Sequence, residues 1–387
     1  MNTDSHDAGG QVRWTDDEGQ EQHARWRSLA GHPAPERVLR AGDEMGAAQA
    51  LRLARAGTGL LWRGDFLNAR HLLVAMGRRL DAQAARPGQR PDPSAGLKEI
   101  FLAQRSAQAQ RSRLLGLLLL PLGADHGLAL RRAPDVREAG LAAHGPVAEP
   151  YVASLRELLG VVGAFEWRKK GVPVAALQAR IHPHHGVFSP VRGEYVDLVA
   201  QAPLPEAAHT AGACDIGTGT GVLAAVLAQR GLSVVATDNA PRAIACALDN
   251  LTRLKLARRV TLVQADLFPL GRAGLVVCNP PWVPAQPGSA LDAAVYDPDS
   301  RMLRGYLAGL AAHLAPGGEG WLILSDLAEH LGLRSREELL GWIAQGGLRV
   351  VGRADTRPSH PRAGDASDPL HAARAAEVTS LWRLAAA

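Results

Sequence analysis

The chain has 387 residues, which leaves room for two domains, and a formal net charge of +5. Its three cysteines all fall in or beside predicted core elements, which excludes a disulfide framework and indicates a reducing compartment. No signal peptide is recognisable, and the apolar run 114–120 is too short to span a membrane, so we expect a cytoplasmic protein.

The N-terminal part divides into an acidic tail and a set of predicted helices. Residues 1–36 are polar and acidic without apolar periodicity, which predicts a disordered tail. Beyond residue 46, segments rich in alanine, leucine and arginine repeat their apolar positions at intervals of three and four, as amphipathic helices do. These segments are 47–61, 66–79, 96–120, 132–143 and 151–162. We therefore expect a helical accessory domain over residues 37–165 and a catalytic domain over residues 166–387.

Positive charge is concentrated in the predicted helical domain. Residues 51–182 contain 20 Lys and Arg against 10 Asp and Glu, whereas residues 183–387 contain 18 against 19. A basic domain beside a neutral core favours an anionic macromolecular partner, with RNA the plainest candidate. An ordinary solvated surface is the alternative, because arginine is the common cation throughout the chain. The candidate phosphate contacts are Arg111, Arg113, Arg131, Arg132, Arg168, Lys169 and Lys170.

A glycine-rich turn follows the first predicted strand of the catalytic domain. The apolar run 211–216 predicts a buried strand, three glycines at alternate positions follow it, and the run 222–229 predicts a helix. Glycine is required where the backbone takes a positive φ or lies against a ligand, so we expect this turn to close over a nucleoside. The dinucleotide fingerprint has its third glycine one position later, which argues against a pyrophosphate here. The candidate cofactor-binding residues of the turn are Asp215, Gly217, Thr218, Gly219 and Gly221.

Acidic residues follow the next two predicted strands. Strand 233–237 runs into Asp238 and Asn239, and a carboxylate there can accept both ribose hydroxyls of either S-adenosylmethionine (SAM) or NAD. Strand 260–263 precedes Asp266 and Leu267, where the carboxylate could accept a hydrogen bond from an adenine amino group. A solvated loop aspartate or a helix cap is the alternative for Asp266.

The fourth predicted strand, 275–278, runs directly into Asn279-Pro280-Pro281-Trp282. Together with the glycine turn, this run resembles the class I SAM-dependent N-methyltransferases of the methyltransferase small domain, or HemK-like, group. That group includes release-factor glutamine methyltransferases and adenine or guanine N-methyltransferases of DNA and RNA. The resemblance covers about residues 183–387. It implies SAM as the cofactor and a Rossmann-like α/β core of seven strands with a late antiparallel edge strand.

The resemblance also implies how the acceptor nitrogen is held. The side-chain oxygen of Asn279 and the carbonyl of Pro280 would accept hydrogen bonds from the target NH₂, while Trp282 stacks on the flat amide or base. An amide or exocyclic amine is a poor nucleophile because its lone pair is delocalised. Two acceptors that grip its hydrogens help it toward tetrahedral geometry as the methyl transfers in line, and the proton can leave afterwards. A rigid turn with a packed tryptophan is the alternative.

The segment before the glycine turn resembles the release-factor methyltransferases less closely. Release-factor methyltransferases have a Pro-Arg-Pro-x-Thr-Glu element here, and this chain keeps Pro190, Arg192 and Glu194 without the run itself. It also has Trp282 where that family usually has tyrosine. Both departures weigh against glutamine as the specific substrate.

Three histidines lie just upstream of that segment. His182, His184 and His185 have no cysteine or carboxylate at a metal-ligand spacing. We therefore expect no metal site and interpret the histidines as a polar wall beside the active site.

The remaining pattern completes an α/β sheet. Helices are predicted at 301–314 and 337–345, and strands at 321–324, 348–352 and 378–384. The stretch 284–300 follows a strand at its carboxyl end, so we expect it to help form the substrate pocket. The polar stretch 356–369 is predicted to be a loop that either contacts substrate or is solvated.

Two functional hypotheses follow from the sequence. The first is a SAM-dependent N-methyltransferase acting on an RNA base amine, a protein glutamine amide such as that of a release factor, or a small-molecule amine. The basic domain favours RNA, and a ribosome-associated protein is the other candidate partner. The second is a catalytically silent nucleoside-binding module. A dehydrogenase is a more distant alternative, because it leaves Asn279-Pro280-Pro281-Trp282 unexplained.

Overall fold

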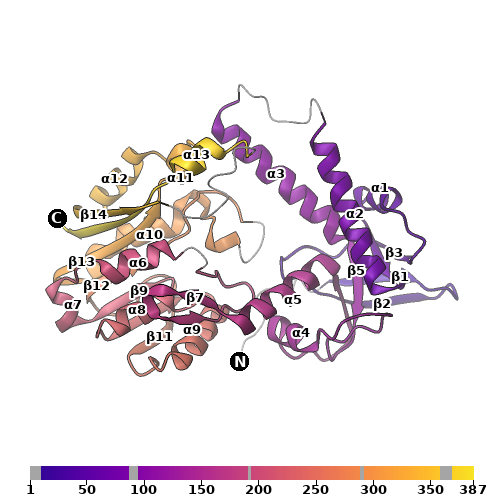
Figure 1. Cartoon of the computed structure of the whole chain (residues 1–387), viewed down its shortest axis with the longest axis horizontal. Helices are drawn as coiled ribbons and strands as arrows, with labels where there is room; N and C mark the ends of the chain where they lie inside the picture. The colour runs from indigo at the N-terminus through magenta and orange to yellow at the C-terminus, as the bar shows by residue number, and fades with distance from the viewer. Residues whose placement is uncertain (1–9, 87–94, 191–192, 288–291, 358–367) are drawn as a thin grey trace. The chain divides into compact units, whose positions relative to one another are not determined.

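The computed structural model describes residues 10–86, 95–190, 193–287, 292–357 and 368–387. The chain divides into two compact units (Figure 1). One takes in Met1–Ala95 and Leu102–Glu166, and the other takes in Gly96–Phe101 and Trp167–Ala387. Among the described residues, no helix combines the length and the apolar character needed to cross a membrane.

The N-terminal unit is built around a six-stranded mixed sheet with the strand order β1-β2-β6-β5-β4-β3. Its strands are β1 (Gln11–Thr15), β2 (Glu21–Trp26), β3 (Arg37–Ala41), β4 (Thr58–Trp62), β5 (Leu118–Leu122) and β6 (Tyr151–Ser154). The helices along this part of the chain are α1 (Ala47–Arg55), α2 (Phe66–Ala84), α3 (Leu97–Gly116), α4 (Arg137–His144) and α5 (Leu155–Lys170).

The prediction of a purely helical domain is therefore wrong. Three of the predicted helices contain a strand at one end, namely β4, β5 and β6. β4 and β6 are buried at every position, and β5 at all but one. A strand with both faces covered is a continuous apolar run without alternation, so its pattern merges with that of an adjoining helix.

The prediction of a disordered tail is also wrong for residues 10–36. β1 and β2 pair as an antiparallel hairpin from Gln11↔Arg25 to Thr15↔Glu21. Val12 and Trp26 of this hairpin are buried in a small apolar cluster that includes Val38 and Leu61. Two buried side chains thus hold strands whose other positions are mostly polar, which is why composition alone pointed to a tail.

The C-terminal unit has a seven-stranded sheet with the order β11-β10-β9-β12-β13-β15-β14. Its strands are β9 (Ala213–Ile216), β10 (Val234–Asp238), β11 (Val260–Gln264), β12 (Ala273–Cys278), β13 (Leu314–Ser325), β14 (Leu348–Thr356) and β15 (Thr379–Ala386). β9 to β13 are parallel to their neighbours, and β15 is antiparallel to both β13 and β14. This topology confirms the expected seven-stranded Rossmann-like core with a late antiparallel strand, but that strand, β15, lies between β13 and β14 and not at the edge of the sheet as expected.

Helices cover both faces of this sheet. The helices are α6 (Glu194–Gln201), α7 (Glu206–Ala211), α8 (Val222–Gln229), α9 (Pro241–Arg253), α10 (Arg301–His313), α11 (Leu327–His330), α12 (Arg336–Gln345) and α13 (His371–Ala376). Short 3₁₀ turns are η1 (Ala175–Leu177), η2 (Asp292–Ala294) and η3 (Pro298–Ser300), and β7 (Val172–Val174) pairs with β8 (Ala179–Ile181). α6, α8 and α9 contribute to the core on one face, and α10 and α12 to that on the other. All three cysteines are free and buried, as expected.

Strand direction determines where functional loops meet. The carboxyl ends of parallel strands β9 to β13 lie along one edge of the sheet, where ligands bind in open α/β folds. Because β15 is antiparallel, its beginning lies at that same edge, with Thr379 opposite Ser325 at the end of β13. Residues just before β15 therefore reach the same edge as the loops that follow the parallel strands.

Candidate functional site

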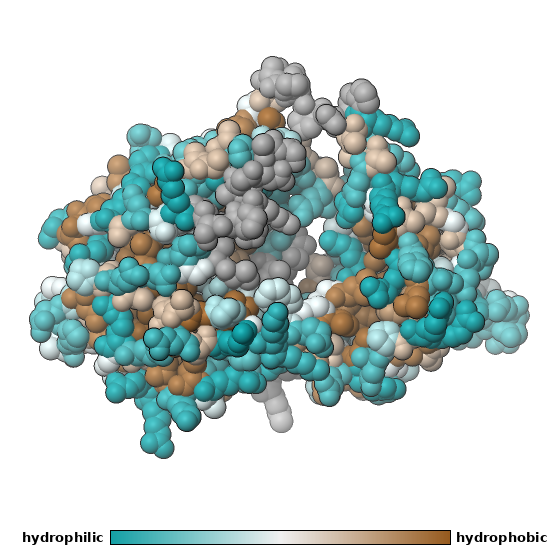
Figure 2. Space-filling model, viewed as in Figure 1, coloured by the Kyte–Doolittle hydropathy of each residue, from teal (hydrophilic) through white to brown (hydrophobic). Residues whose placement is uncertain are grey.

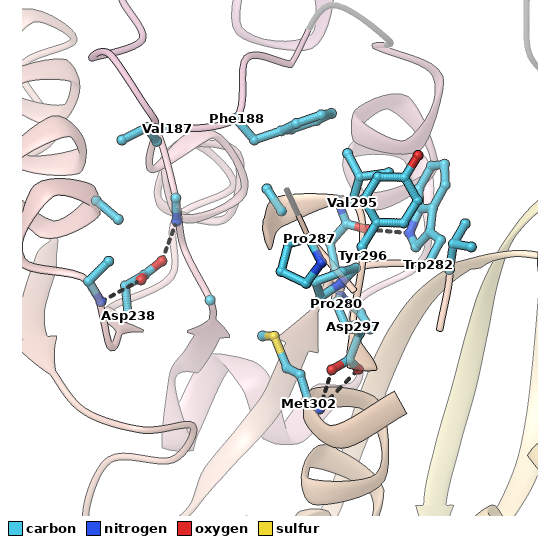
Figure 3. A pocket seen from close by; sticks show the side chains of 18 of the residues that line it. Val187, Phe188, Asp238, Pro280, Trp282, Pro287, Val295, Tyr296, Asp297 and Met302 are labelled. Carbon is cyan, nitrogen blue, oxygen red and sulfur yellow. Dashed lines mark hydrogen bonds between the residues drawn. The ribbon is translucent and has the colours of Figure 1, made fainter. Parts of the chain in front are cut away.

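A cavity of about 850 Å³ lies at this edge of the C-terminal unit, near the upper end of the ~300–1,000 Å³ that small-molecule sites occupy. Loops that follow β9, β10, β11 and β12 contribute to its lining, together with residues just before β15. Of the residues predicted to bind the cofactor or the acceptor, only Asp215 and Gly221 are outside the lining. In Figure 3, Asp238 lies on one side of the cavity and Trp282 on the other.

The glycine turn connects β9 to α8 with three residues in the left-handed region. Gly217, Gly219 and Gly221 have φ values of +71°, +53° and +79°, which side chains rarely allow. A Cβ on Gly219 would meet no protein atom within 4 Å, whereas one on Gly217 would lie 2.5 Å from Met302 Cε. Gly219 thus presents bare backbone to the cavity, as close approach of a ligand requires.

Asp215 stabilises the glycine turn through two hydrogen bonds. It is buried at the end of β9, and its Oδ2 accepts hydrogen bonds from Thr218 Oγ1 at 2.6 Å and from the Ala224 N–H at 3.0 Å. Burial raises the pKa of its carboxyl to about 6. Its position assigns it to holding the turn and the start of α8.

Asp238 lines the cavity at the end of β10. Its Oδ2 accepts from the Gly219 N–H at 3.0 Å and its Oδ1 from the Ala240 N–H at 2.9 Å (Figure 3). Burial raises the pKa of this carboxyl. Backbone donors thus fix the carboxylate in place, and Asn239 beside it also lines the cavity.

Asp266 and Leu267 line the cavity after β11. The Asp266 carboxylate pairs with Arg301 Nη2 at 2.8 Å, and both side chains are more than half exposed. Leu267 has a φ of +72°, and the Thr237 hydroxyl donates to its carbonyl at 2.6 Å. A non-glycine residue held in this conformation beside a cavity is typical of a functional site.

The run Asn279–Trp282, called the clamp below, follows β12 and lines the cavity throughout. Trp282 Nε1 donates to Asn279 Oδ1 at 2.8 Å. An indole N–H can only donate, so this contact identifies the amide oxygen as the atom facing it, and that oxygen has a second lone pair. The Trp282 ring also meets Tyr195 edge to face, with centroids 6.5 Å apart.

Arg334 supports the clamp by a hydrogen bond to its backbone. Its side chain is buried, and its Nη1 donates to the Trp282 carbonyl at 3.4 Å while its Nη2 donates to the Ser325 carbonyl at 3.5 Å. The guanidinium therefore joins the clamp to the end of β13. No sequence motif marks this residue.

Met302 also lines the cavity, although no sequence motif marks it, and so does Asp297 from the stretch 284–300. Asp297 is buried, and its carboxylate accepts hydrogen bonds from the backbone N–H groups of Met302 and Leu303. It therefore satisfies donors in the first turn of α10. Val283 forms a bridge with Tyr296, which folds the stretch after the clamp back onto it. The stretch 284–300, apart from 288–291, which lie outside the described residues, thus contributes to the cavity as predicted.

The sequence also did not identify the lining residues that come from α11 and from just before β15, called the β15 end below. Its members are Leu327, Leu331, Leu370, Arg374 and Glu377. The sequence prediction for 356–369 falls largely outside the described residues. The members of the β15 end come after that stretch, except Leu327 in α11 and Leu331, which directly follows α11. Their arrangement depends on the antiparallel direction of β15, which sequence patterns do not reveal.

The three histidines pack against α9 instead of lining the cavity, so their interpretation as a wall of the site is wrong. The His182 N–H donates to Asn250 Oδ1 at 2.7 Å, and His184 Nε2 lies 3.2 Å from Asp249 Oδ2. Burial lowers the pKa of His185 to about 4. No group of three metal-ligating side chains occurs within the described part of the chain.

Four of the seven candidate phosphate contacts are engaged by carboxylates of the protein itself. The pairs are Arg111–Asp81, Arg131–Asp65, Arg132–Asp65 and Arg168–Asp249, at 2.7–3.1 Å. These arginines are therefore poor candidates for phosphate contacts. Other arginines, including Arg70, Arg78 and Arg79 on α2, have exposed side chains, and Figure 2 shows hydrophilic residues over this region.

The lining fits SAM. Gly219 offers open backbone for a ligand's close approach, and Asp238 offers a fixed carboxylate of the kind that binds ribose hydroxyls. Apolar side chains such as Val187, Leu267 and Met302 lie between and around them, as a nucleoside and a methionine chain require. The cavity is large enough to extend beyond the cofactor to a second ligand.

Comparison with known proteins gives one family match and several sequence relatives. Residues 178–334 match the family model "Methyltransferase small domain". The chain is 29% identical over 266 residues to the release factor glutamine methyltransferase of Geobacter sulfurreducens, covering 64% of this chain and 86% of that one. It is 33% identical over 149 residues to the tRNA1(Val) (adenine(37)-N6)-methyltransferase of Shewanella loihica, covering 35% of this chain and 60% of that one. A solved ribosomal protein L11 methylase from Lactobacillus delbrueckii subsp. bulgaricus is 17% identical, with a TM-score of 0.36 and coverage of 53% and 85%.

Proposed function

We propose that this chain, which carries a SAM-dependent methyltransferase domain of the methyltransferase small group, methylates a planar amine of an RNA base. The observation that carries the proposal is the shared cavity of the glycine turn and the clamp. A cofactor held at Asp238 and an acceptor held at Asn279 would face each other across it (Figure 3).

SAM supplies an electrophilic methyl group on a sulfonium when it is bound. Gly217 and Gly219 shape the backbone against the cofactor, and Asp238 orients its ribose. Asn279 Oδ1 and the Pro280 carbonyl accept the hydrogens of the target nitrogen and turn its lone pair toward the methyl. Stabilisation of the developing charge by such fixed acceptors is worth roughly 10²–10³ in rate for each group. The proton of the methylated nitrogen leaves after transfer, so no strong base is required beforehand.

The basic surplus of residues 51–182 supports RNA as the acceptor class. The relative from Shewanella loihica modifies a tRNA adenine. A protein glutamine is the second candidate, because the relative from Geobacter sulfurreducens is a release factor glutamine methyltransferase. Either substrate would place the protein with the translation machinery of the cytoplasm.

A tritium-transfer assay tests the proposal. Purified protein and labelled SAM are incubated with an extract of a strain lacking the gene, which is then separated into RNA, protein and small-molecule fractions. Label in RNA is expected, and label in a protein band would move the assignment to glutamine. SAM binding without label in any fraction would overturn methyl transfer and leave a binding module.

A further inference from the structure

We propose that the C-terminal unit has its own docking surface for the acceptor RNA, outside the cavity, where the end of α5 meets α9. This surface is called the α5–α9 patch, and its members are Trp167, Lys170, Arg180, Leu248, Arg253 and Lys255. All of them belong to the unit that takes in Trp167–Ala387. The inference rests on the proposed function and specifies how the catalytic unit holds its substrate.

Positive charge is concentrated at the patch, although residues 183–387 are almost neutral in total. Residues 167–182 contain four Lys and Arg and no Asp or Glu, and residues 241–255 contain three Lys and Arg and one Asp. The two stretches together therefore carry seven basic residues against one acid. A local surplus of this kind attracts an anionic polymer.

Hydrogen bonds join the two stretches into one surface. The acid, Asp249 on α9, accepts from Arg168 Nη2 at the end of α5 at 3.1 Å and from Arg253 Nε at 2.9 Å. Arg180 of β8 donates from Nη1 to the Gly171 carbonyl, directly after α5, at 3.0 Å. The ends of α5 and α9 and the strand β8 thus hold their basic side chains close together.

The patch is open to solvent and combines charge with apolar surface. Trp167 and Leu248 are 52% and 53% exposed, and each adjoins a member of the ion pair between α5 and α9. The charged members are also exposed, namely Lys170, Arg180, Arg253 and Lys255. An exposed tryptophan among cations suits a nucleic acid, because a base can stack on its ring while phosphates meet the cations. An acidic polypeptide offers the charge without the bases.

The distance between the patch and the cavity suits a polymer. Arg242, in the first turn of α9, lines the cavity. Asp249 stands seven residues later on the same helix, which is about 10 Å along its axis. The segment from His182 to Val187 follows this length, since the His182 N–H donates to Asn250 Oδ1 at 2.7 Å and Val187 lines the cavity. A small acceptor in the cavity could not reach the patch, whereas an RNA strand with one base in the cavity could.

The first experiment measures the salt dependence of RNA binding by the full-length protein. Fluorescence anisotropy follows a mixed-sequence single-stranded RNA oligonucleotide over a series of salt concentrations. Each phosphate contact to a single strand contributes about 0.7 to the slope of log K against log salt. Lys170→Gln with Lys255→Gln should therefore reduce the slope by about 1.4 and weaken binding at low salt by about tenfold or more.

The control removes the same charge elsewhere in the C-terminal unit. Arg272→Gln with Arg349→Gln changes two exposed arginines, one directly before β12 and one in β14, and should leave the slope unchanged. An unchanged slope in the lysine double variant, or an equal reduction in both double variants, would overturn the α5–α9 patch.

The second experiment distinguishes RNA from an acidic polypeptide. Trp167→Ala should weaken binding of the RNA oligonucleotide by about tenfold without changing the slope, because stacking on a base releases no counterions. Poly-L-glutamate has negative charge and no bases, so its binding should not change in Trp167→Ala. Unchanged RNA binding in Trp167→Ala, or tighter wild-type binding of poly-L-glutamate than of the RNA, would overturn RNA as the occupant.

Methyl transfer separates this inference from the proposed function. With the RNA labelled in the tritium-transfer assay as substrate, Lys170→Gln with Lys255→Gln should raise KM by about tenfold at low salt and leave SAM affinity unchanged. Methylation of that RNA with an unchanged KM would overturn the patch and leave the proposed function intact. Label confined to protein would overturn the proposed function itself.

Discussion

The indole N–H of Trp282 holds the side-chain oxygen of Asn279 at 2.8 Å, which orients the clamp before an acceptor arrives. Tyrosine or phenylalanine at this position could stack on an acceptor but has no indole N–H to make this contact. The tryptophan therefore gives this chain a preorganised clamp, at the cost of one lone pair on the amide oxygen.

Replacing Asn279 by alanine should lower kcat about 10²–10³-fold, because the lost acceptor serves the target nitrogen. SAM affinity measured by calorimetry should change little. Asp238→Ala is the matched comparison and should weaken SAM binding instead. Loss of SAM binding in Asn279→Ala would show that the clamp belongs to the cofactor site.

Asp215 gives a prediction about pH and stability. Its pKa is raised from 3.8 to about 6 by burial, so the folded protein retains a proton that the unfolded chain releases between these values. Stability therefore falls as pH rises through this window, by about 3 kcal/mol for a shift of about two pH units. Asp215→Asn has an oxygen that can accept from Thr218 and Ala224, and it should not show this loss.

Urea unfolding of both proteins from about pH 4 to pH 7 measures the difference. The free energy of unfolding of Asp215→Asn relative to wild type should rise up to about pH 6 and then level off. A difference that does not vary with pH would contradict the prediction.

At the scale of elements, the glycine turn can be tested with a control from the same unit. Gly219 and Gly231 both have positive φ, and a Cβ on either would meet no atom within 4 Å. Alanine at each should therefore cost a similar amount of stability, about 1 kcal/mol. Only Gly219 lines the cavity, so only Gly219→Ala should weaken SAM binding measured by calorimetry. Equal SAM affinities in the two variants would place the cofactor elsewhere.

The elements also show what the sequence could and could not predict. α8 was predicted with its observed ends, and β9 to β12 within two residues, because punctuating glycines and acids separate short apolar runs there. β4 and β5 were absorbed into helices, since buried strands carry no alternation that distinguishes them. The glycine turn and clamp were found because local motifs mark them. Arg334 and Glu377 were missed because only the sheet topology brings them to the site.

At the scale of the whole molecule, charge is distributed unevenly along the chain. The surplus in residues 51–182 lies beside a nearly neutral C-terminal part, and Arg78 and Arg79 on α2 are exposed. Arg78→Glu with Arg79→Glu should weaken RNA binding by about tenfold or more at low salt and less at high salt, because phosphate contacts release counterions. SAM affinity should remain unchanged.

The control for this prediction is a second double variant, Arg258→Glu with Arg349→Glu. It makes the same change of net charge at exposed positions of the C-terminal unit. Filter binding or fluorescence anisotropy over a series of salt concentrations compares the two double variants. Equal weakening by both would indicate a general effect of net charge instead of a surface on α2.

β15 lies between β13 and β14 although it follows both in the chain. During synthesis on the ribosome, β13 and β14 emerge first but have no partner to join them until β15 has been made. The half of the sheet that binds the cofactor can thus assemble before the half that holds Glu377. A nascent chain could acquire its nucleoside pocket early, yet the cavity would gain its lining from the residues just before β15 only when this inserted strand closes the sheet.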